Sequence, residues 1–449
     1  MHPNSLLSRR DAMQAMAAGP STAAAVGGTL GPSQTYTRAT RGLPPLKITN
    51  VKAILTCPAN IRTLVVVKVE TSEPGLFGLG CSTGSLRPYA VRSAVEDYLH
   101  PFAQGKDADM IEDMWQSAFV SSYWRNGSIL NSALSGLDQA LWDIKAKRAN
   151  MPLYQLLGGK CRFAVECYSH ASGATLEQLE ESVRRLMPQG FRHIRIQQGG
   201  YGSAQLSKTP HFRNAGFGAA DDEYMDAGPY ARSVPKMFDY IRNKCGDEVE
   251  LLHDVHERLP PIDAINLCKR VEQYRPFFIE DPFAPEDIGY FRQLREQTST
   301  PIAMGELFNS PHEWTGLITD RLIDFIRIHI SQSGGLTRAL KVTRLAEWFN
   351  VRTAWHGPSN VSPVGHAVNA HIDLAAWNFG IQESYVFQDQ VRDVFPGAPT
   401  FKDGYMFVNE APGHGVDIDE KAAAKYPVPK DHASWWKQVR RRDGTSVRP

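Results

Sequence analysis

The sequence lacks the features that mark several large classes of protein. Its six cysteines are scattered and form no C-x-x-C pair, which argues against a disulfide framework and against a cysteine-based zinc site. It has no run of about 18 apolar residues, so no transmembrane helix is predicted. The formal net charge is +1, which provides no electrostatic case for binding nucleic acid or an anionic membrane.

Two common catalytic signatures are also missing. The chain has neither the Walker A pattern of P-loop NTPases nor a G-x-G-x-x-G placed after a predicted strand, as a Rossmann dehydrogenase would have. What is present is the composition of an ordinary globular protein, with 42% hydrophobic and 22% charged residues. A length of 449 residues is enough for two or three domains with a sizeable core.

The first 43 residues differ in composition from the rest of the chain. Ser8-Arg9-Arg10-Asp11 precedes a stretch rich in Ala, Gly and Met, and Ser, Thr, Gly and Pro follow it. A twin-arginine pair before a weakly apolar segment resembles a Tat export signal. We therefore expect residues 1–43 to be a Tat signal or else a disordered extension, and the protein to be periplasmic, with the cytoplasm as the alternative.

Residues 44–160 are predicted to form an α+β unit. Apolar residues alternate through residues 46–69 and again through 76–80, which predicts antiparallel strands joined by hairpins. The apolar period then becomes helical, most clearly between Ile129 and Ala149. Pro152 and the pair Gly158-Gly159 end that helical run.

From residue 161 onward, predicted strands alternate with predicted helices. The strands are Phe163–Ser169, Arg192–Gln197, Val249–Val255, Pro276–Glu280, Pro301–Gly305, Asp324–Ile330, Val351–His356 and Phe379–Glu383. The helices between them include Leu176–Met187, Val234–Lys244, Ile262–Tyr274, Ile288–Thr298, Leu336–Phe349 and Pro363–Ala376. This alternation favours a (β/α) barrel over residues 161–399. Residues 400–449 carry turn signals and a charged tail, and we expect them to pack back on the first unit.

Three acidic residues stand at the ends of three successive predicted strands. They are Asp254, Glu280 and Glu306, and the separation is 26 residues both times. One strand-helix repeat therefore separates each from the next, so their carboxylates should meet at the barrel rim where active sites lie. Converging carboxylates repel one another unless a cation sits between them, and oxygen ligands suit Mg²⁺. The sequence thus predicts a magnesium site.

The strand that ends near Asp254 also carries two histidines. Side chains alternate along a strand, so Asp254 and His256 should share a face while His253 points the other way. We therefore interpret His256 as a candidate proton donor beside the metal, and His253 as a packing residue.

The segments that carry these acids resemble those of a known enzyme family. They read HDVHERL at 253–259, FIEDPF at 278–283 and MGELFNS at 304–310. Other matching segments are ALWDIK at 140–145, PLYQLLGG at 152–159, WHG at 355–357, FGIQE at 379–383 and EAPGHGVD at 410–417. From about Lys47 to Asp443 the chain resembles the mannonate dehydratase subgroup of the enolase superfamily. This subgroup consists of mandelate racemase/muconate lactonizing enzyme-like proteins and includes starvation-sensing-like members.

The resemblance implies a fold and a reaction. The fold is an α+β capping domain over a modified TIM barrel, (β/α)₇β, with Mg²⁺ held by Asp254, Glu280 and Glu306. Strand alternation would turn the neighbouring Asp281 away from the metal. The reaction is that of a lyase: a hydro-lyase removing water from a sugar acid such as D-mannonate or D-gluconate, which yields a 2-keto-3-deoxy acid.

The resemblance also implies catalytic roles. A base takes the proton beside the carboxylate and an acid helps the C3 hydroxyl leave. His256 matches the acid, and Tyr201, assisted by Arg195, matches the base. Tyr224 and Tyr230 are the alternatives for the base. The expected substrate-binding residues are His356, Glu383, His170 and Arg125.

Two other functions remain open. The chain could be a catalytically weak or inactive sugar-acid-binding member of the family, because the segment around Tyr201 is shorter than in the subgroup. It could also be a racemase or epimerase, although Arg195 and Gln197 stand where such an enzyme would have a Lys-x-Lys pair. In each case we expect a homo-oligomer whose partner is a small sugar acid.

Overall fold

The computed structural model of the protein describes residues 42–60, 62–84, 86–199, 223–429, 439–441 and 445–448. The predicted export signal lies outside these residues, apart from Gly42 and Leu43. Tyr201 also lies outside them. In the described part of the chain, no helix is both long and apolar enough to cross a membrane.

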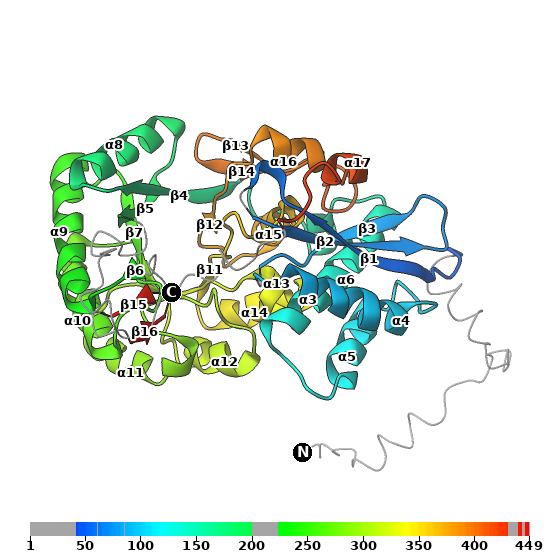
Figure 1. The fold of residues 1–449 in the computed structure, drawn as a ribbon, viewed down its shortest axis with the longest axis horizontal. Helices are drawn as coiled ribbons and strands as arrows, with labels where there is room; N and C mark the ends of the chain where they lie inside the picture. Colours follow the sequence, from blue (N-terminus) through cyan, green and yellow to red (C-terminus); the bar gives the residue numbers. More distant parts are fainter. Residues whose placement is uncertain are drawn as a thin grey trace, which may run out of the picture. The chain divides into compact units, whose positions relative to one another are not determined.

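The first unit is an antiparallel sheet covered by helices (Figure 1). Its strands β1 (Ile48–Thr56), β2 (Leu64–Thr71) and β3 (Phe77–Cys81) pair in the order β1-β2-β3. The helices are α3 (Pro88–Ser93), η2 (Ala94–Leu99), α4 (His100–Ala103), α5 (Ile111–Ser121), α6 (Ser128–Arg148) and α7 (Leu153–Leu156). Helix α6 packs directly on β3, where a Cβ at Gly80 would lie 2.0 Å from the Gly136 carbonyl oxygen. Glycine is required at that contact.

The second unit is a barrel of parallel strands. These are β4 (Val165–Gly173), β5 (His193–Gln198), β7 (Glu250–Asp254), β8 (Phe278–Glu280), β9 (Ile302–Met304), β10 (Phe325–Ile326), β11 (Arg352–Thr353) and β12 (Gln382–Glu383). The sheet order is β11-β10-β9-β8-β7-β5-β4, and β12 pairs with β4. A bridge between Thr353 and Phe379 completes the circuit. All eight predicted strands are present, and the predicted fold class is confirmed.

Helices follow most of the strands. They are α8 (Leu176–Leu186), α9 (Ala227–Cys245), α10 (Pro261–Val271), α11 (Tyr290–Arg295), α12 (Pro311–Thr319), α13 (Ile330–Ser333), α14 (Leu336–Trp348), α15 (Pro363–Ala375) and α16 (Asp389–Val394). The predicted strand Asp324–Ile330 was too long, because α13 begins at Ile330. The prediction also missed α12, which a Ser310–Glu313 capping box starts.

The alternation of strand side chains produces two separate cores. Inside the barrel lie Tyr168, Leu252, Phe278, Ala303, Phe325, Ala354 and Ile381. Between the strands and the surrounding helices lies a larger core that includes Ile196 and Leu251. Leu252 faces inward, so Asp254, two residues further on, faces inward as well. The same argument brings Glu280 inward above Phe278.

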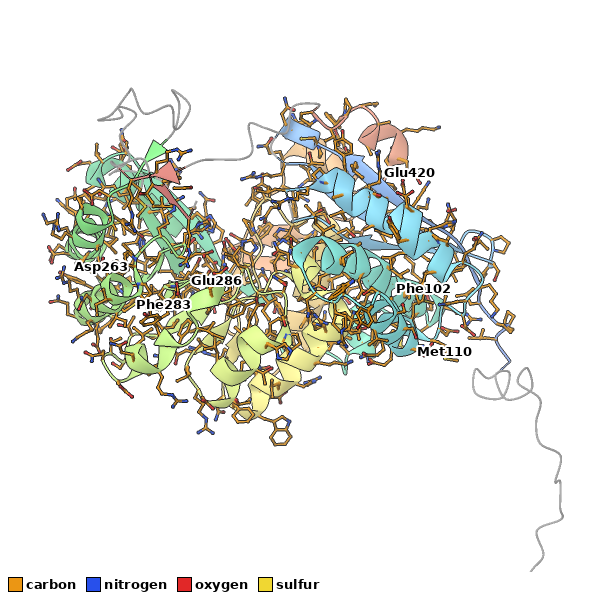
Figure 2. The ribbon with its side chains drawn as sticks, turned by 60° about the horizontal axis from the view of Figure 1, so that its bottom comes forward. Phe102, Met110, Asp263, Phe283, Glu286 and Glu420 are labelled. Carbon is orange, nitrogen blue, oxygen red and sulfur yellow. The ribbon has the colours of Figure 1, made fainter. Side chains whose placement is uncertain are left out.

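The C-terminal residues occupy three places. The hairpin of β13 (Thr400–Lys402) and β14 (Tyr405–Phe407) pairs with β4 of the barrel. Helix α17 (Glu420–Ala423) begins at Glu420, which is labelled in Figure 2, and lies against the first sheet. Glu420 pairs there with Lys52 and Lys68 at 2.8 Å each. Strands β15 (Val439–Arg440) and β16 (Ser446–Val447) join β6 (Glu223–Tyr224). The expected return to the first unit thus describes α17 but not the two strand pairs.

Candidate active site

The predicted acids gather at the rim formed by the C-terminal ends of the barrel strands. Asp254 is the last residue of β7 and lies opposite Glu280, the last residue of β8. Both side chains are fully buried. Arg195 of β5 lies between them, with Nη1 at 3.1 Å from Asp254 Oδ2 and 3.1 Å from Glu280 Oε2. The guanidinium therefore bridges two of the three predicted metal ligands.

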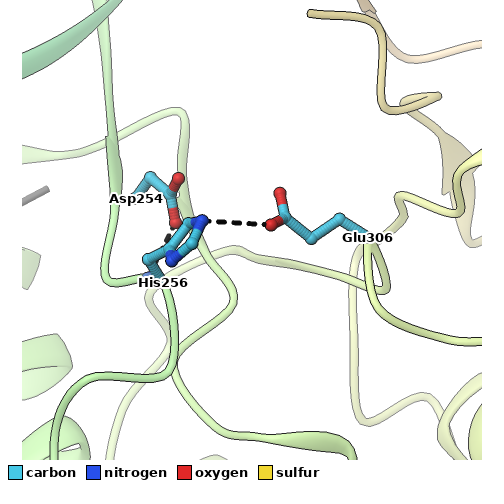
Figure 3. Close-up of side chains that lie close together, drawn as sticks. All are labelled: Asp254, His256 and Glu306. Carbon is cyan, nitrogen blue, oxygen red and sulfur yellow. Dashed lines mark hydrogen bonds and ion pairs between the residues drawn. The ribbon is translucent and has the colours of Figure 1, made fainter. Parts of the chain in front are cut away.

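Glu306, the third acid, meets His256 across the rim (Figure 3). The distance from His256 Nε2 to Glu306 Oε1 is 3.2 Å, and the His256 backbone N–H donates to Asp254 Oδ1 at 2.8 Å. Strand β7 ends at Asp254, and His256 has a left-handed backbone with φ 54°. His256 therefore faces the acids through a turn rather than through the strand alternation from which its position was predicted.

Arg327 is a central residue that the sequence interpretation missed. It follows β10 and is fully buried. Its guanidinium lies 2.6 Å from Glu383 Oε2, 2.8 Å from Glu306 Oε2 and 3.4 Å from Glu280 Oε2. Its position in the apolar segment FIRIHI at 325–330 was an available signal, because alternation turns Arg327 inward with Phe325.

The site contains a cluster of buried charged residues, which includes Asp254, Glu280, Glu306, Arg195 and Arg327. Asp281 does not point away from this cluster as strand alternation predicted. The strand ends one residue earlier, and Asp281 takes a left-handed backbone with φ 40°. Its Oδ1 accepts a hydrogen bond from the Gly305 N–H at 2.9 Å, and its Oδ2 lies 3.5 Å from Arg327 Nη1. Asp281 is therefore a further acid of the same network.

Histidines surround these acids. His170 of β4 lies 2.8 Å from Glu383 Oε1, and its Nδ1 lies 3.3 Å from Arg195 Nη2. His356, after β11, lies 3.3 Å from Glu306 Oε2. His329, which was also missed, has its ring centroid 5.1 Å from that of His356, with the two ring planes tilted by 40°. Three of the four predicted substrate-binding residues (His170, His356 and Glu383) thus belong to the cluster.

Arg125 is the predicted substrate-binding residue that the structure does not join to the cluster. It is exposed in the segment between α5 and α6. No hydrogen bond or ion pair links it to the cluster within the described residues.

The alternative base Tyr230 is excluded by its position. It is 2% exposed in α9 and lies on the outer side of β7, where its hydroxyl is 2.9 Å from His253 Nε2. His253 Nδ1 lies 2.9 Å from the Ile196 carbonyl oxygen, which can only accept. The Nδ1 therefore carries the proton, and Nε2 accepts from the Tyr230 hydroxyl. His253 is a packing residue, as predicted. Nothing is described of the Tyr224 side chain.

Burial and neighbouring charges shift the pKa values of Asp254, His256 and Glu306. Burial raises the pKa of Asp254 to about 6, although the charge of His256 lowers it. Burial would lower the pKa of His256, but the charges of Glu306 and Asp254 raise it to about 9. Burial would raise the pKa of Glu306, but the charges of His356, His256 and Arg327 bring it well below its usual range. Without a bound cation, His256 is therefore protonated at neutral pH beside an ionised Glu306.

The donor set fits a hard divalent cation. Carboxylates outnumber guanidiniums in the network, so it has negative charge to offset. Ligand atoms of Asp254, His256 and Glu306 lie within 4.8 Å of one another. Glu280 Oε1 is buried and has no hydrogen-bond partner among the described residues. A buried carboxylate oxygen without a partner is costly unless a ligand meets it.

Comparison with known families identifies both units. Residues 45–158 match the mandelate racemase/muconate lactonizing enzyme N-terminal domain, and residues 178–422 match the enolase C-terminal domain-like family. A protein from Roseovarius sp. described as mandelate racemase/muconate lactonizing enzyme-like is 24% identical with a TM-score of 0.74, and it shares the fold. The fold and the site therefore define an enolase-superfamily protein.

Closer relatives narrow the family. A D-galactonate dehydratase family member from Salmonella virchow is 50% identical over 422 residues, covering 90% of this chain and 99% of the relative. A crystal structure of an enolase from Pantoea ananatis with bound D-gluconate and Mg is also 50% identical. It covers 90% of this chain and 100% of its own, with a TM-score of 0.86. This chain belongs to the D-galactonate dehydratase family. The predicted superfamily is confirmed, whereas the Salmonella virchow relative carries the name of the D-galactonate dehydratase family rather than that of mannonate dehydratase.

Proposed function

We propose that the protein is a Mg²⁺-dependent sugar-acid dehydratase that converts an aldonic acid into its 2-keto-3-deoxy acid. One observation carries this proposal: His256 Nε2 lies 3.2 Å from Glu306 Oε1, at a rim where Asp254 and Glu280 end their strands. A proton donor thus lies beside a converging set of carboxylates. Family membership and the D-gluconate and Mg of the Pantoea ananatis structure support the same chemistry.

Asp254, Glu280 and Glu306 are the residues that would hold the cation. When bound, a divalent cation supplies positive charge against the negative charge that develops on the substrate carboxylate as its α-proton leaves. Arg195 and Arg327 already neutralise part of the charge of these acids. The two guanidiniums also fix the carboxylates in place before the cation or the substrate arrives.

His256 is proposed as the general acid. In the metal-free site, burial would lower its pKa, but the charges of Glu306 and Asp254 raise it to about 9, so the imidazole is protonated before the cation binds. It can therefore give a proton from Nε2 to the departing C3 hydroxyl, after which Glu306 and Asp254 favour taking a proton back. Glu306 lies on the Nε2 side of the ring and orients it toward the rim.

Tyr201 is proposed as the base that removes the α-proton. It follows the end of β5 by three positions in the sequence, and β5 carries Arg195. A guanidinium near a tyrosine favours the phenolate and so lowers its pKa. Around the rim, His170, His356, Glu383 and Arg327 offer donors and acceptors for the carboxylate and hydroxyl groups of a sugar acid.

The test is a screen of D-gluconate, D-mannonate and D-galactonate with Mg²⁺, with detection of 2-keto-3-deoxy products. We expect turnover of D-gluconate or its C2 epimer D-mannonate, and none after the metal is chelated. Tyr201→Phe should remove activity but leave Mg²⁺ binding unchanged, because Tyr201 is not among the proposed metal ligands. Calorimetric binding of an acid without turnover would favour a sugar-acid-binding protein. Exchange of the α-proton in D₂O without loss of water would favour a racemase or epimerase.

A further inference from the structure

Strands β5 and β7 are neighbours in the barrel, but their pairing stops before the rim. The register runs from His193 opposite Glu250 to Arg195 opposite Leu252, although β5 continues to Gln198. On the other sides of these strands, β4 stays paired with β5 to its end, and β8 stays paired with β7 to its end. An interval without ladder pairing therefore separates the ends of two strands, β5, which carries Arg195, and β7, which carries Asp254.

Two side chains bridge this interval, one on each face of the sheet. On the inner face, Gln197 Nε2 donates to the Asp254 carbonyl oxygen at 3.1 Å. On the outer face, His253 Nδ1 donates to the Ile196 carbonyl oxygen at 2.9 Å. Each bond joins a residue near the end of β5 to a residue near the end of β7. Side chains thus replace the backbone ladder at the point where the cluster begins.

Helix α9 contacts the outer bridge, the hydrogen bond between His253 and Ile196, through Tyr230. The Tyr230 hydroxyl donates to His253 Nε2 at 2.9 Å and also lies 3.4 Å from the Asp254 carbonyl oxygen. Tyr230 and His253 are 2% and 1% exposed, so water does not compete with these bonds. The chain Tyr230–His253–Ile196 therefore ties α9, β7 and β5 together. Strand β5 and helix α9 stand on either side of a long connection in the sequence. The hydrogen bonds from Tyr230 to His253 to Ile196 therefore hold both of these elements.

We propose that Tyr230 and His253 are positioning residues that set the separation of Arg195 and Asp254, and through it the affinity of the site for its divalent cation. This inference rests on the proposed function. Neither residue faces the inside of the barrel; they act through the backbone of Asp254. Residues that contact the metal ligands without touching the metal affect metal affinity strongly, since a ligand held out of place binds more weakly.

The matched variants are Tyr230→Phe and Tyr240→Phe. Both tyrosines lie on α9, and each substitution removes one hydroxyl while the ring stays. The Tyr240 hydroxyl donates to Glu180 of α8 at 3.1 Å, and in the part of the chain that the structure describes it makes no hydrogen bond to β7. His253→Asn is the second variant, because its amide can still donate to the Ile196 carbonyl while the acceptor for Tyr230 is lost.

Affinity is measured with Mn²⁺ alone as the probe, by the loss of the free-ion electron paramagnetic resonance signal, beside thermal melting and steady-state kinetics. We expect Tyr230→Phe to weaken Mn²⁺ binding about tenfold, and to lower kcat with little change in KM for the sugar acid. His253→Asn should show a smaller loss, and Tyr240→Phe should bind Mn²⁺ like the wild type even if its melting temperature falls equally.

Equal Mn²⁺ affinity in Tyr230→Phe and Tyr240→Phe would overturn the inference and leave a purely structural contact. Failure of the wild-type protein to bind Mn²⁺ would instead overturn the proposed function. If Tyr230→Phe does not fold, the comparison of His253→Asn with the wild type decides in the same way.

Discussion

The two faces of β7 show how one strand supports two kinds of buried environment. Asp254 points inward and His253 outward, and both are essentially fully buried. The inner face is ionic, because Arg195 and neighbouring acids surround Asp254. The outer face is neutral, because burial lowers the pKa of His253 to about 4. His256, only three residues further along the chain, has its pKa raised to about 9.

This difference shows that burial by itself does not decide the charge of a histidine. Desolvation disfavours the charged form in both cases, but at His256 two carboxylates outweigh it. At His253 the ring bonds to a carbonyl and a hydroxyl, which a neutral imidazole satisfies. The charged side chains of the inner face can exchange protons and bind a cation. The neutral hydrogen bonds of the outer face can fix the strand that carries Asp254.

The largest difference between the two faces should appear in catalysis. His256→Asn removes the proposed acid and should lower kcat by about 10²- to 10⁴-fold. His253→Asn keeps one of its two bonds and should lower kcat by less than about tenfold. Steady-state kinetics on the sugar acid that the screen identifies measures both. Equal losses in the two variants would remove the distinction between the faces.

The next difference should appear in stability. Arg327→Met leaves Glu306, Glu383 and Glu280 without their shared guanidinium, and breaking such a buried network costs about 3–5 kcal/mol. Arg338→Met is the control, because Arg338 is also buried but donates weakly to neutral groups. Denaturant unfolding without divalent cation measures both variants. A loss for Arg327→Met no larger than that for Arg338→Met would show that the inner face is not held by charge.

The smallest effect is a pH dependence of the metal-free protein. His256 has a pKa of about 9 in the folded state against 6.5 as its ordinary value. Its contribution to stability is therefore complete below about pH 6.5 and is lost as the pH rises to about 9. The melting temperature of the wild type should fall more over this window than that of His256→Gln. Parallel curves for the two proteins would show that Glu306 and Asp254 do not hold the proton.

Much of the fold followed from periodicity, because barrel strands are short apolar runs separated by helices with a clear 3.6 period. Helix α12 was missed although Ser310 and Glu313 form a capping box, a local signal in the sequence. The pairing of β6 with β15 joins Glu223 to Val439. No local pattern predicts a contact between two-residue strands so far apart in the chain.

The acids of the site were predictable and several of their partners were not. The regular spacing of Asp254, Glu280 and Glu306 placed them at one rim, where the structure has them. Arg327 was hidden inside an apolar run that periodicity treats as core. Asp281 was misplaced because its left-handed backbone breaks the alternation on which the prediction depended.

We propose above that Asp254, Glu280 and Glu306, which end or closely follow three neighbouring strands, bind the Mg²⁺ on which dehydration depends. Calorimetric titration of Mg²⁺ into the metal-free wild type and into Asp254→Asn tests it most directly. We expect one binding event per chain in the wild type and loss of that event in Asp254→Asn, together with loss of turnover. Undiminished Mg²⁺ binding by Asp254→Asn, or turnover that survives in it, would show that these carboxylates do not form the magnesium site.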